Sequence, residues 1–205
     1  LIKLNNSGDS LTSVANIESY SVNYKDYITT STNEVVVAGS SGNFISGKQP
    51  VYVAKYLNGV KIFSYNFALT NYDEVYVNGI SECYDGNYIV YGSCKNFSQT
   101  PRHGFILKVD KNGSFISERI LVNNNDIQLT SANEYMANTY FVSVIGTGQQ
   151  PGLYKLDSNL SLLSTIQNNI WSVNQLIIKG TTLFCASFGS NASSYEVVVL
   201  SKFSF

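Results

Sequence analysis

The chain has 205 residues, with 13 Lys and Arg against 14 Asp and Glu and a net charge of −1. Because only 13% of the residues are charged, no basic face can release counterions from a phosphate backbone, which excludes nucleic-acid binding as the main function. A hydrophobic content of 44% is enough for a sizeable buried core. No apolar run approaches the roughly 18 to 20 residues that span a bilayer, so we expect no membrane span in the visible chain.

The predicted strands begin with residues 1–4 and a returning strand at residues 11–15. We interpret these as the third and fourth strands of a blade whose first two strands are missing. The next unit contains Asn58-Gly59 between two apolar runs, which is the strongest short hairpin signal because both residues adopt positive φ readily. Later units repeat the same order of strands and turns. We predict a single domain over residues 1–205, with a partial blade at 1–15 and blades at 22–67, 75–122, 127–166 and 172–205.

Two independent markers support this repeat. One is a strand that closes on Gly-Ser or Gly-Thr, and the other is an apolar strand that carries a lysine near its end. The glycines lie 53, 54 and 43 residues apart, and the lysines 52, 53, 47 and 47. A shared period near fifty predicts a propeller or a solenoid. The glycines are Gly39, Gly92, Gly146 and Gly189, and the lysines are Lys3, Lys55, Lys108, Lys155 and Lys202.

The fold class that follows is all-β. No window holds apolar residues at helical spacing for several turns, whereas Gly, Asn and Asp interrupt the chain about every ten residues, which is the spacing of strands and turns. We predict a β-propeller of four-stranded antiparallel blades, with about four blades in this stretch. A larger ring that includes these blades is one alternative, and a β-sandwich or β-solenoid built from similar hairpins is another.

The ends of the chain bear on closure of the ring. Residues 1–4 and 199–203 both have the character of a third strand, so five third strands stand against four pairs of first and second strands. We therefore expect that the 205 residues do not close a ring by themselves. An exposed strand edge invites another strand, which would come from a longer polypeptide or from a neighbouring subunit by β-augmentation.

Long loops point to the face where a ligand is expected. The longest ones, at residues 41–50, 95–103 and 190–194, all join a second strand to a third strand and therefore share one face of the ring. Loops on a rigid scaffold commonly carry binding residues. We expect ligand recognition on this face.

One stretch resembles a known family. Residues 85–93 (DGNYIVYGS) and 104–113 (GFILKVDKNG) are similar to the repeat unit of the prokaryotic SBBP-type β-propeller family. The resemblance extends over all 205 residues, although the tryptophan common after the Asn-Gly turn is absent and the fourth repeat is short. It implies a secreted or cell-surface protein, and it implies no shared catalytic residues.

Three functions follow as hypotheses. The first is a non-catalytic binding or structural module at the cell surface, which meets a protein partner or copies of itself through terminal edge strands. The second is a carbohydrate-binding, lectin-like propeller. The third, a hydrolase or lyase, is disfavoured because no acids, bases or metal ligands converge in the sequence pattern. We expect no cofactor and no bound metal.

Aromatic residues are the most distinctive content, with 15 Tyr, 11 Phe and one Trp. Most should pack between blades, where large flat side chains fill the space. A remainder close to turns could stack on sugars or bind a partner. The candidates for ligand binding are Tyr65, Tyr72, Tyr84 and Trp171.

Polar candidates for chemistry are few. His103 is the only histidine, and we interpret it as a solvated surface residue without a catalytic partner. Asp73 and Glu74 precede a first strand, and we interpret them as solvated turn residues. Asp110 and Asp157 occupy matching turns and should accept hydrogen bonds from their own backbone, with calcium binding as the alternative.

The three cysteines are Cys83, Cys94 and Cys185. A two-residue turn at Asp85-Gly86 would place Cys94 opposite Val77 and keep Cys83 too far from Cys94 for a disulfide. We expect free, buried thiols.

Five sequons are candidate glycosylation sites in a secreted chain, three in turns and two in loops of the variable face. They lie at Asn5, Asn96, Asn112, Asn159 and Asn191.

Overall fold

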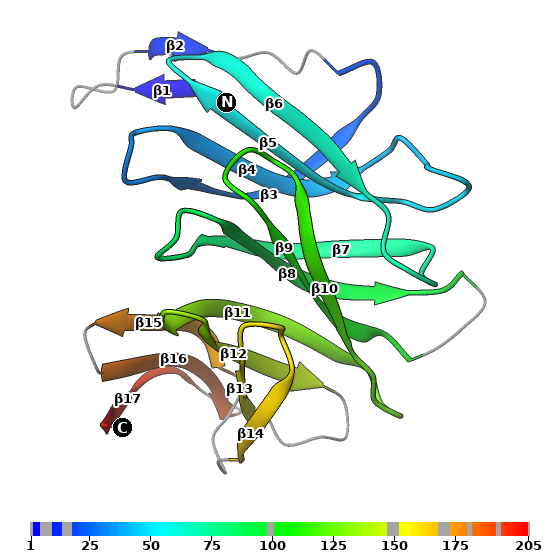
Figure 1. Ribbon diagram of the computed structural model, residues 1–205. Coiled ribbons are helices and arrows are strands. Elements are labelled where there is room, and N and C mark those ends of the chain that lie inside the picture. Colours follow the sequence, from blue (N-terminus) through cyan, green and yellow to red (C-terminus); the bar gives the residue numbers. More distant parts are fainter. Residues whose placement is uncertain are drawn as a thin grey trace.

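The computed structural model describes residues 2–4, 10–13, 18–97, 101–146, 152–167, 173–179, 182–191 and 194–204. Among these residues the elements of secondary structure are all β-strands, which confirms the all-β prediction (Figure 1). Five antiparallel sheets form in chain order, and within each sheet every strand pairs with its neighbour in the sequence.

Three sheets have four strands, and we call them blades 1 to 3. Blade 1 contains β3 (Val22–Thr29), β4 (Val35–Ser41), β5 (Val51–Leu57) and β6 (Val60–Phe67). Blade 2 contains β7 (Glu74–Glu82), β8 (Tyr88–Lys95), β9 (His103–Val109) and β10 (Phe115–Leu121). Blade 3 contains β11 (Ile127–Met136), β12 (Thr139–Gly146), β13 (Gly152–Leu156) and β14 (Leu162–Gln167).

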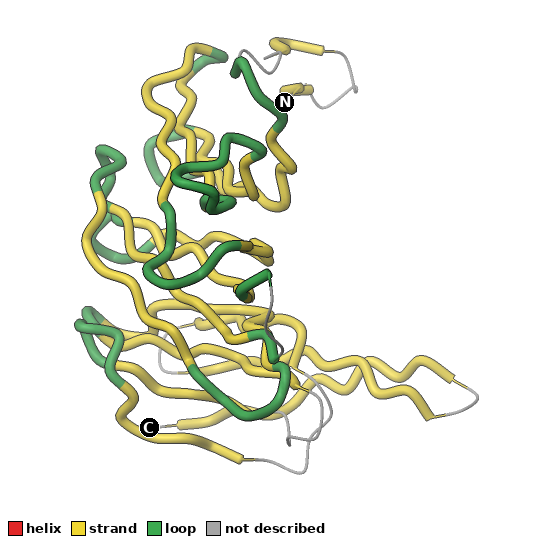
Figure 2. Tube along the Cα trace, turned by 90° about the vertical axis from the view of Figure 1, so that its right-hand side faces the viewer, coloured by secondary structure: helices red, strands yellow, loops and turns green. Residues whose placement is uncertain are grey.

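Two smaller sheets stand at the ends of the row. Blade 4 has three described strands, β15 (Val173–Lys179), β16 (Thr182–Asn191) and β17 (Ser194–Ser204). The first sheet has two, β1 (Ile2–Leu4) and β2 (Ser10–Ser13). The strands β1 and β17 lie in separate sheets, with the two ends of the chain at opposite ends of the molecule (Figures 1 and 2).

The blades pack face to face through their first strands. β7 contacts β3 and β4 of blade 1, β11 contacts β7 and β8, and β15 contacts β11 and β12. One apolar core lies between blades 1 and 2 and includes Val53, Tyr88 and Leu107. A second lies between blades 2 and 3 and includes Ile106, Leu129 and Val142. This arrangement is a β-propeller of about four blades, as the sequence predicts.

Each first strand has a β-bulge at the same place. The register shifts between Tyr24 and Asp26 in β3 and between Val77 and Gly79 in β7. It also shifts between Leu129 and Ser131 in β11 and between Val173 and Gln175 in β15. A bulge adds one unpaired residue and bends its strand. The first strands are therefore bent alike in all four blades.

The observed strand pairing in blade 2 differs from the predicted register. Cys94 pairs with Val75 instead of Val77, and the turn after β7 has three residues, since the Cys83 N–H bonds the Asn87 carbonyl. Gly86 adopts a φ of 78° in this turn, a conformation that glycine allows without strain. The two-residue turn predicted here was wrong, whereas Asn58 and Gly59, with φ values of 50° and 82°, form the two-residue turn expected there.

Candidate functional site

A group of polar side chains lies at the start of β7, and we call it the β7 cluster: Glu74, Tyr76, Lys95 and Arg102. Along β7, Val75 and Val77 are buried in the core between blades 1 and 2. Since successive side chains of a strand point to opposite faces, Glu74 and Tyr76 lie on the other face. The Tyr76 side chain is 37% exposed, so the cluster is open to a ligand.

Short contacts hold the β7 cluster together. The Tyr76 hydroxyl donates to Glu74 Oε2 at 2.7 Å, and Lys95 Nζ lies 3.0 Å from the same oxygen. The Arg102 guanidinium lies 4.9 Å from the centre of the Tyr76 ring. Lys95 ends β8 and Arg102 directly precedes β9. The two cations thus flank the loop that joins the second and third strands, on the face where the sequence predicts ligand recognition.

The surroundings of Glu74 and Tyr76 determine the protonation states of the two side chains. The hydrogen bond from Tyr76 and the Lys95 ammonium hold the pKa of Glu74 below its ordinary value. The same hydrogen bond, together with burial, raises the pKa of Tyr76. At neutral pH the carboxylate is ionised and the phenol is protonated, with the acceptor for its proton already in place. The contact is the one that a nucleophile and its base require, and both pKa shifts keep the proton on Tyr76 in the resting state.

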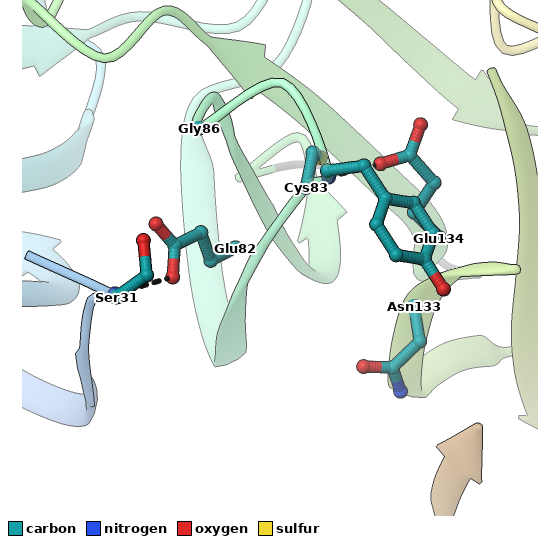
Figure 3. Close-up of a pocket in the computed structure, with 7 residues that line it drawn as sticks. Ser31, Glu82, Cys83, Gly86, Asn133 and Glu134 are labelled. Carbon is teal, nitrogen blue, oxygen red and sulfur yellow. Dashed lines mark hydrogen bonds between the residues drawn. The ribbon is translucent and has the colours of Figure 1, made fainter. Parts of the chain in front are cut away.

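A cavity of about 420 Å³ lies at the opposite end of β7, in the size range of small-ligand sites. Figure 3 shows Ser31 and Glu82 on one side of it and Asn133 and Glu134 on the other, with the turn at Gly86 between them. Tyr76 and Glu82 are six residues apart on one strand, a span of about 20 Å at the usual strand rise. The β7 cluster and the cavity are separate places.

The cavity carboxylates are fixed by backbone groups. Glu134 is buried, and its two oxygens accept the N–H groups of Tyr84 and Asn138. Glu82 Oε2 accepts the Ser31 N–H at 3.2 Å. Glu82 and Glu134 pair with Tyr88 and Tyr140 in their own blades, so they occupy equivalent positions 52 residues apart.

The aromatic residues that the sequence proposes as ligand contacts do not come together. Tyr84 is 68% exposed and lines the cavity. Tyr65, 48% exposed, lies on the outer strand β6 against Phe63 and Phe67. Tyr72 packs edge-on against His103 with the ring centroids 5.7 Å apart. Trp171 lies outside the described residues. Ligand binding by these residues stays a prediction.

Two interpretations of polar residues need correction. His103 begins β9 and is half-buried, and its Nδ1 accepts the Asn123 N–H at 3.3 Å, so it is a packed residue rather than a solvated one. Glu74 is ion-paired within a strand rather than solvated in a turn. Asp73, by contrast, lies just before β7, and its Oδ2 accepts the Phe97 N–H at 3.1 Å.

Other sequence interpretations hold. Asp110 Oδ1 accepts the N–H groups of Asn112 and Ser114 at 2.8 and 2.7 Å, and Asp157 makes the equivalent bonds in its own turn. Cys83 and Cys94 are free and buried, as expected.

The sequons differ in exposure where the structure describes them. Asn112 and Asn159 are exposed and Asn96 is half-buried. The side chains of Asn5 and Asn191 lie outside the described residues, as does that of Cys185. Glycosylation stays a prediction.

No protein-family model and no curated protein matches this sequence. Among solved structures, the chain is similar to an α-L-arabinofuranosidase from Fusarium graminearum, with a TM-score of 0.60 and 10% identity over 88% of this chain and 62% of that one. It is also similar to the N10 neuraminidase-like protein of A/little yellow-shouldered bat/Guatemala/060/2010, with a TM-score of 0.51 and 12% identity over 91% and 60%. These likenesses show a shared propeller fold.

The comparisons correct the predicted function. The similar structures include a GH93 α-L-arabinofuranosidase in complex with arabinobiose, so the expectation of a non-catalytic binding or structural module was wrong. The chain spans about 62% of the length of that enzyme. Among the described residues there is no helix that could cross a membrane.

The sequence pattern missed most of the polar residues found here. Tyr76, Lys95 and Arg102 come from a strand and the two ends of a loop, and their meeting depends on the pairing of β7 with β8. Glu82 and Glu134 carried a signal, because they recur at the period of the repeat. Glu82 and Glu134 lie at the ends of the first strands, whereas the acids that the sequence analysis singled out, Asp73 and Glu74, precede a first strand.

Proposed function

We propose that this chain belongs to a glycan-hydrolysing propeller and that the β7 cluster takes part in the chemistry. The observation that carries the proposal is the 2.7 Å hydrogen bond from the Tyr76 hydroxyl to the ionised Glu74. It lies on a first strand, at the end that carries the long loops. The shared fold with glycosidases supports the reaction class.

The mechanism follows from the pair. Tyr76 Oη attacks the anomeric carbon of the sugar while Glu74 accepts the phenolic proton, and the bond to the departing sugar oxygen breaks. Tyrosine nucleophiles occur among glycosidases as an exception to paired carboxylates. The departing oxygen takes a proton from solvent. Water then attacks the anomeric carbon of the glycosyl-tyrosine and loses a proton to solvent, while Glu74 returns its proton to Tyr76 Oη as the sugar–tyrosine bond breaks.

Lys95 and Arg102 assist the attack by Tyr76 through their position and their charge. Lys95 keeps Glu74 ionised. Arg102 lies against the Tyr76 ring, where a cation is attracted by the negative face of an aromatic group. As Tyr76 loses its proton during attack, both cations stabilise the developing negative charge on its oxygen.

A secreted or cell-surface location belongs to the same proposal. The resemblance to SBBP-type repeats supports it, and so does the polymeric nature of glycan substrates outside the cell. Self-assembly through the terminal strands stays a prediction.

Turnover of aryl glycosides tests the proposal. The unmodified protein is assayed with aryl α-L-arabinofuranosides and aryl sialosides, next to Tyr76→Phe and Glu74→Gln. We expect each variant to lose activity by about 10² to 10⁴-fold, the usual contribution of a positioned base or acid. Tyr27→Phe is the matched control, because Tyr27 is an exposed tyrosine on β3 of blade 1, and it should keep full activity. Equal rates for Tyr76→Phe and the unmodified protein, or no turnover of any glycoside, would overturn the proposal.

A further inference from the structure

Three metal-binding side chains meet at the wall of the cavity, on the turn after β7 and near the end of β11. The Cys83 thiol, a carboxylate oxygen of Asp85 and a carboxylate oxygen of Glu134 all lie within 4.8 Å of one another. Cys83 and Glu134 line the cavity itself. Two consecutive blades contribute to the group, so it exists only in the packed propeller.

The thiol gives an independent sign of a ligand. Cys83 is only 5% exposed and lines the cavity, and among the described residues nothing donates a hydrogen bond to its sulfur or accepts one from it. Both buried cysteines of blade 2 belong to apolar cores, Cys83 to the core between blades 2 and 3 and Cys94 to that between blades 1 and 2, the usual place for an inert cysteine. Cys83 differs because it also lines the cavity and lies beside two carboxylates.

The carboxylates are held ready for a ligand. The two oxygens of Asp85 accept the backbone N–H and the side-chain amide of Asn87 at 3.0 and 2.7 Å, and each oxygen of Glu134 accepts one backbone N–H. A carboxylate oxygen has two lone pairs, so each keeps one for a cation. Hydrogen bonds of this kind orient metal ligands and strengthen metal sites.

Negative charge is in excess around the cavity. Glu82 and Glu134 line it, and Asp85 lies next to Cys83 and Glu134. The Lys108 ammonium, 3.7 Å from Asp85 Oδ2, balances one of these three charges. Lys108 is anchored on its other side, since Nζ donates to the Tyr140 hydroxyl at 2.7 Å. Excess negative charge in a partly enclosed cavity favours a bound cation.

We propose that Cys83, Asp85 and Glu134 bind a divalent cation of borderline softness, of which Zn²⁺ is the representative. A thiolate selects against Mg²⁺ and Ca²⁺, which prefer oxygen ligands alone. Three protein ligands leave a fourth position open toward the cavity, as in zinc sites that hold water or a substrate. Binding displaces the thiol proton to solvent as the sulfur–metal bond forms. The site is independent of the β7 cluster at the other end of the strand.

Direct metal binding tests the proposal without reference to activity. The whole chain, stripped of metal with a chelator, is titrated with Zn²⁺ by calorimetry and with Cd²⁺ by ultraviolet absorption, in which a thiolate ligand gives a charge-transfer band. We expect one ion per chain and a Cd²⁺–thiolate band. Cys83→Ser should abolish the band and weaken Zn²⁺ binding by roughly tenfold or more, the scale on which disturbed metal sites lose affinity.

Matched variants make the outcome decisive. Cys94→Ser removes the other buried thiol of blade 2 and should leave the band unchanged. Asp85→Asn and Glu134→Gln keep the thiol and should weaken Zn²⁺ binding, with circular dichroism confirming that each variant is folded. A band that survives in Cys83→Ser, or the lack of any stoichiometric Zn²⁺ binding by the unmodified chain, would overturn the site.

Discussion

The lysine that marks each repeat has a structural role that its sequence position alone does not reveal. Lys55 and Lys108 are 7% and 5% exposed, and each lies over a tyrosine of the following blade, Tyr88 or Tyr140. Each also pairs with a carboxylate of its own blade, Glu34 for Lys55 at 2.9 Å and Asp85 for Lys108 at 3.7 Å. Buried charges need such partners. At Lys55 and Lys108, the repeated lysine therefore joins one blade to the next.

Lys108→Met tests this role at the level of one residue. The methionine keeps an apolar stem of similar length but leaves the buried Tyr140 hydroxyl without the donor that Lys108 provides. We expect the free energy of unfolding to fall by about 2 kcal/mol, the usual cost of an unsatisfied buried polar group. Urea denaturation measures it. Lys111→Met, at an exposed position of the adjacent turn, should change stability by less than about 0.5 kcal/mol, and an equal effect of both variants would contradict the role of Lys108.

At the scale of single strands, the bulge explains the glycine marker in blades 1 and 2, where Gly39 and Gly92 pair with the residue at which the register shifts. A Cβ at Gly39 or Gly92 would come within 2.2 or 2.0 Å of a backbone oxygen of the preceding strand, that of Asn23 or Tyr76. The bent first strand brings its backbone onto the second strand where it closes on Gly-Ser or Gly-Thr. Only glycine fits there, so the marker recurs for a packing reason.

Gly92→Ala is the corresponding prediction. The clash is with backbone, which cannot rotate away, so the two strands must separate locally. We expect a loss of about 3 kcal/mol in the free energy of unfolding, at the upper end of overpacking effects. Gly47→Ala is the control, because Gly47 has open space around it and its φ of 81° is the only obstacle, worth about 1 to 2 kcal/mol. A smaller loss for Gly92→Ala than for Gly47→Ala would contradict the account.

The same bulge limited what the sequence could predict. Apolar runs and turn residues revealed the strands and their order, because both depend on local pattern. The extra residue in β7 and the three-residue turn after it each shift the pairing by one residue and leave that pattern intact, so Cys94 was placed opposite Val77 instead of Val75. The β7 cluster and the group at Cys83 depend on pairing and on packing between blades, and that is why local pattern did not reveal them.

At the scale of the whole molecule, polar bonds from each first strand fix the next blade. Ile80 N–H donates to Asp26 Oδ2 at 3.1 Å, and Asn78 Nδ2 donates to the Leu129 carbonyl at 2.8 Å. Ser81 Oγ donates to the Ala132 carbonyl at 2.7 Å, and Asn133 Nδ2, at the equivalent position of blade 3, donates to the Leu176 carbonyl at 2.9 Å. Blade packing is thus both apolar and hydrogen-bonded.

The last prediction is that acid destabilises the whole propeller. Hydrogen bonds from Lys61, Lys55 and Tyr76 hold the pKa values of Glu18, Glu34 and Glu74 below their ordinary value, and backbone N–H groups do the same for Asp110. A carboxyl group with a lowered folded pKa adds stability above its unfolded pKa and loses it as the pH falls through the folded value. Burial lowers the pKa of His103, so protonation disfavours the fold from about pH 6.5 downward.

All five groups therefore act in the same direction. We expect the midpoint of thermal unfolding to change little from pH 8 to 7, to decline gently below about 6.5 as unfolded His103 takes up a proton, and to fall steeply below about 4.5 as the carboxyl groups titrate. Glu18→Gln should make the acid limb shallower, because one of the contributing carboxylates is gone. A midpoint that stays constant or rises between pH 5 and pH 3 would show that these four carboxylates add no stability in their ionised form.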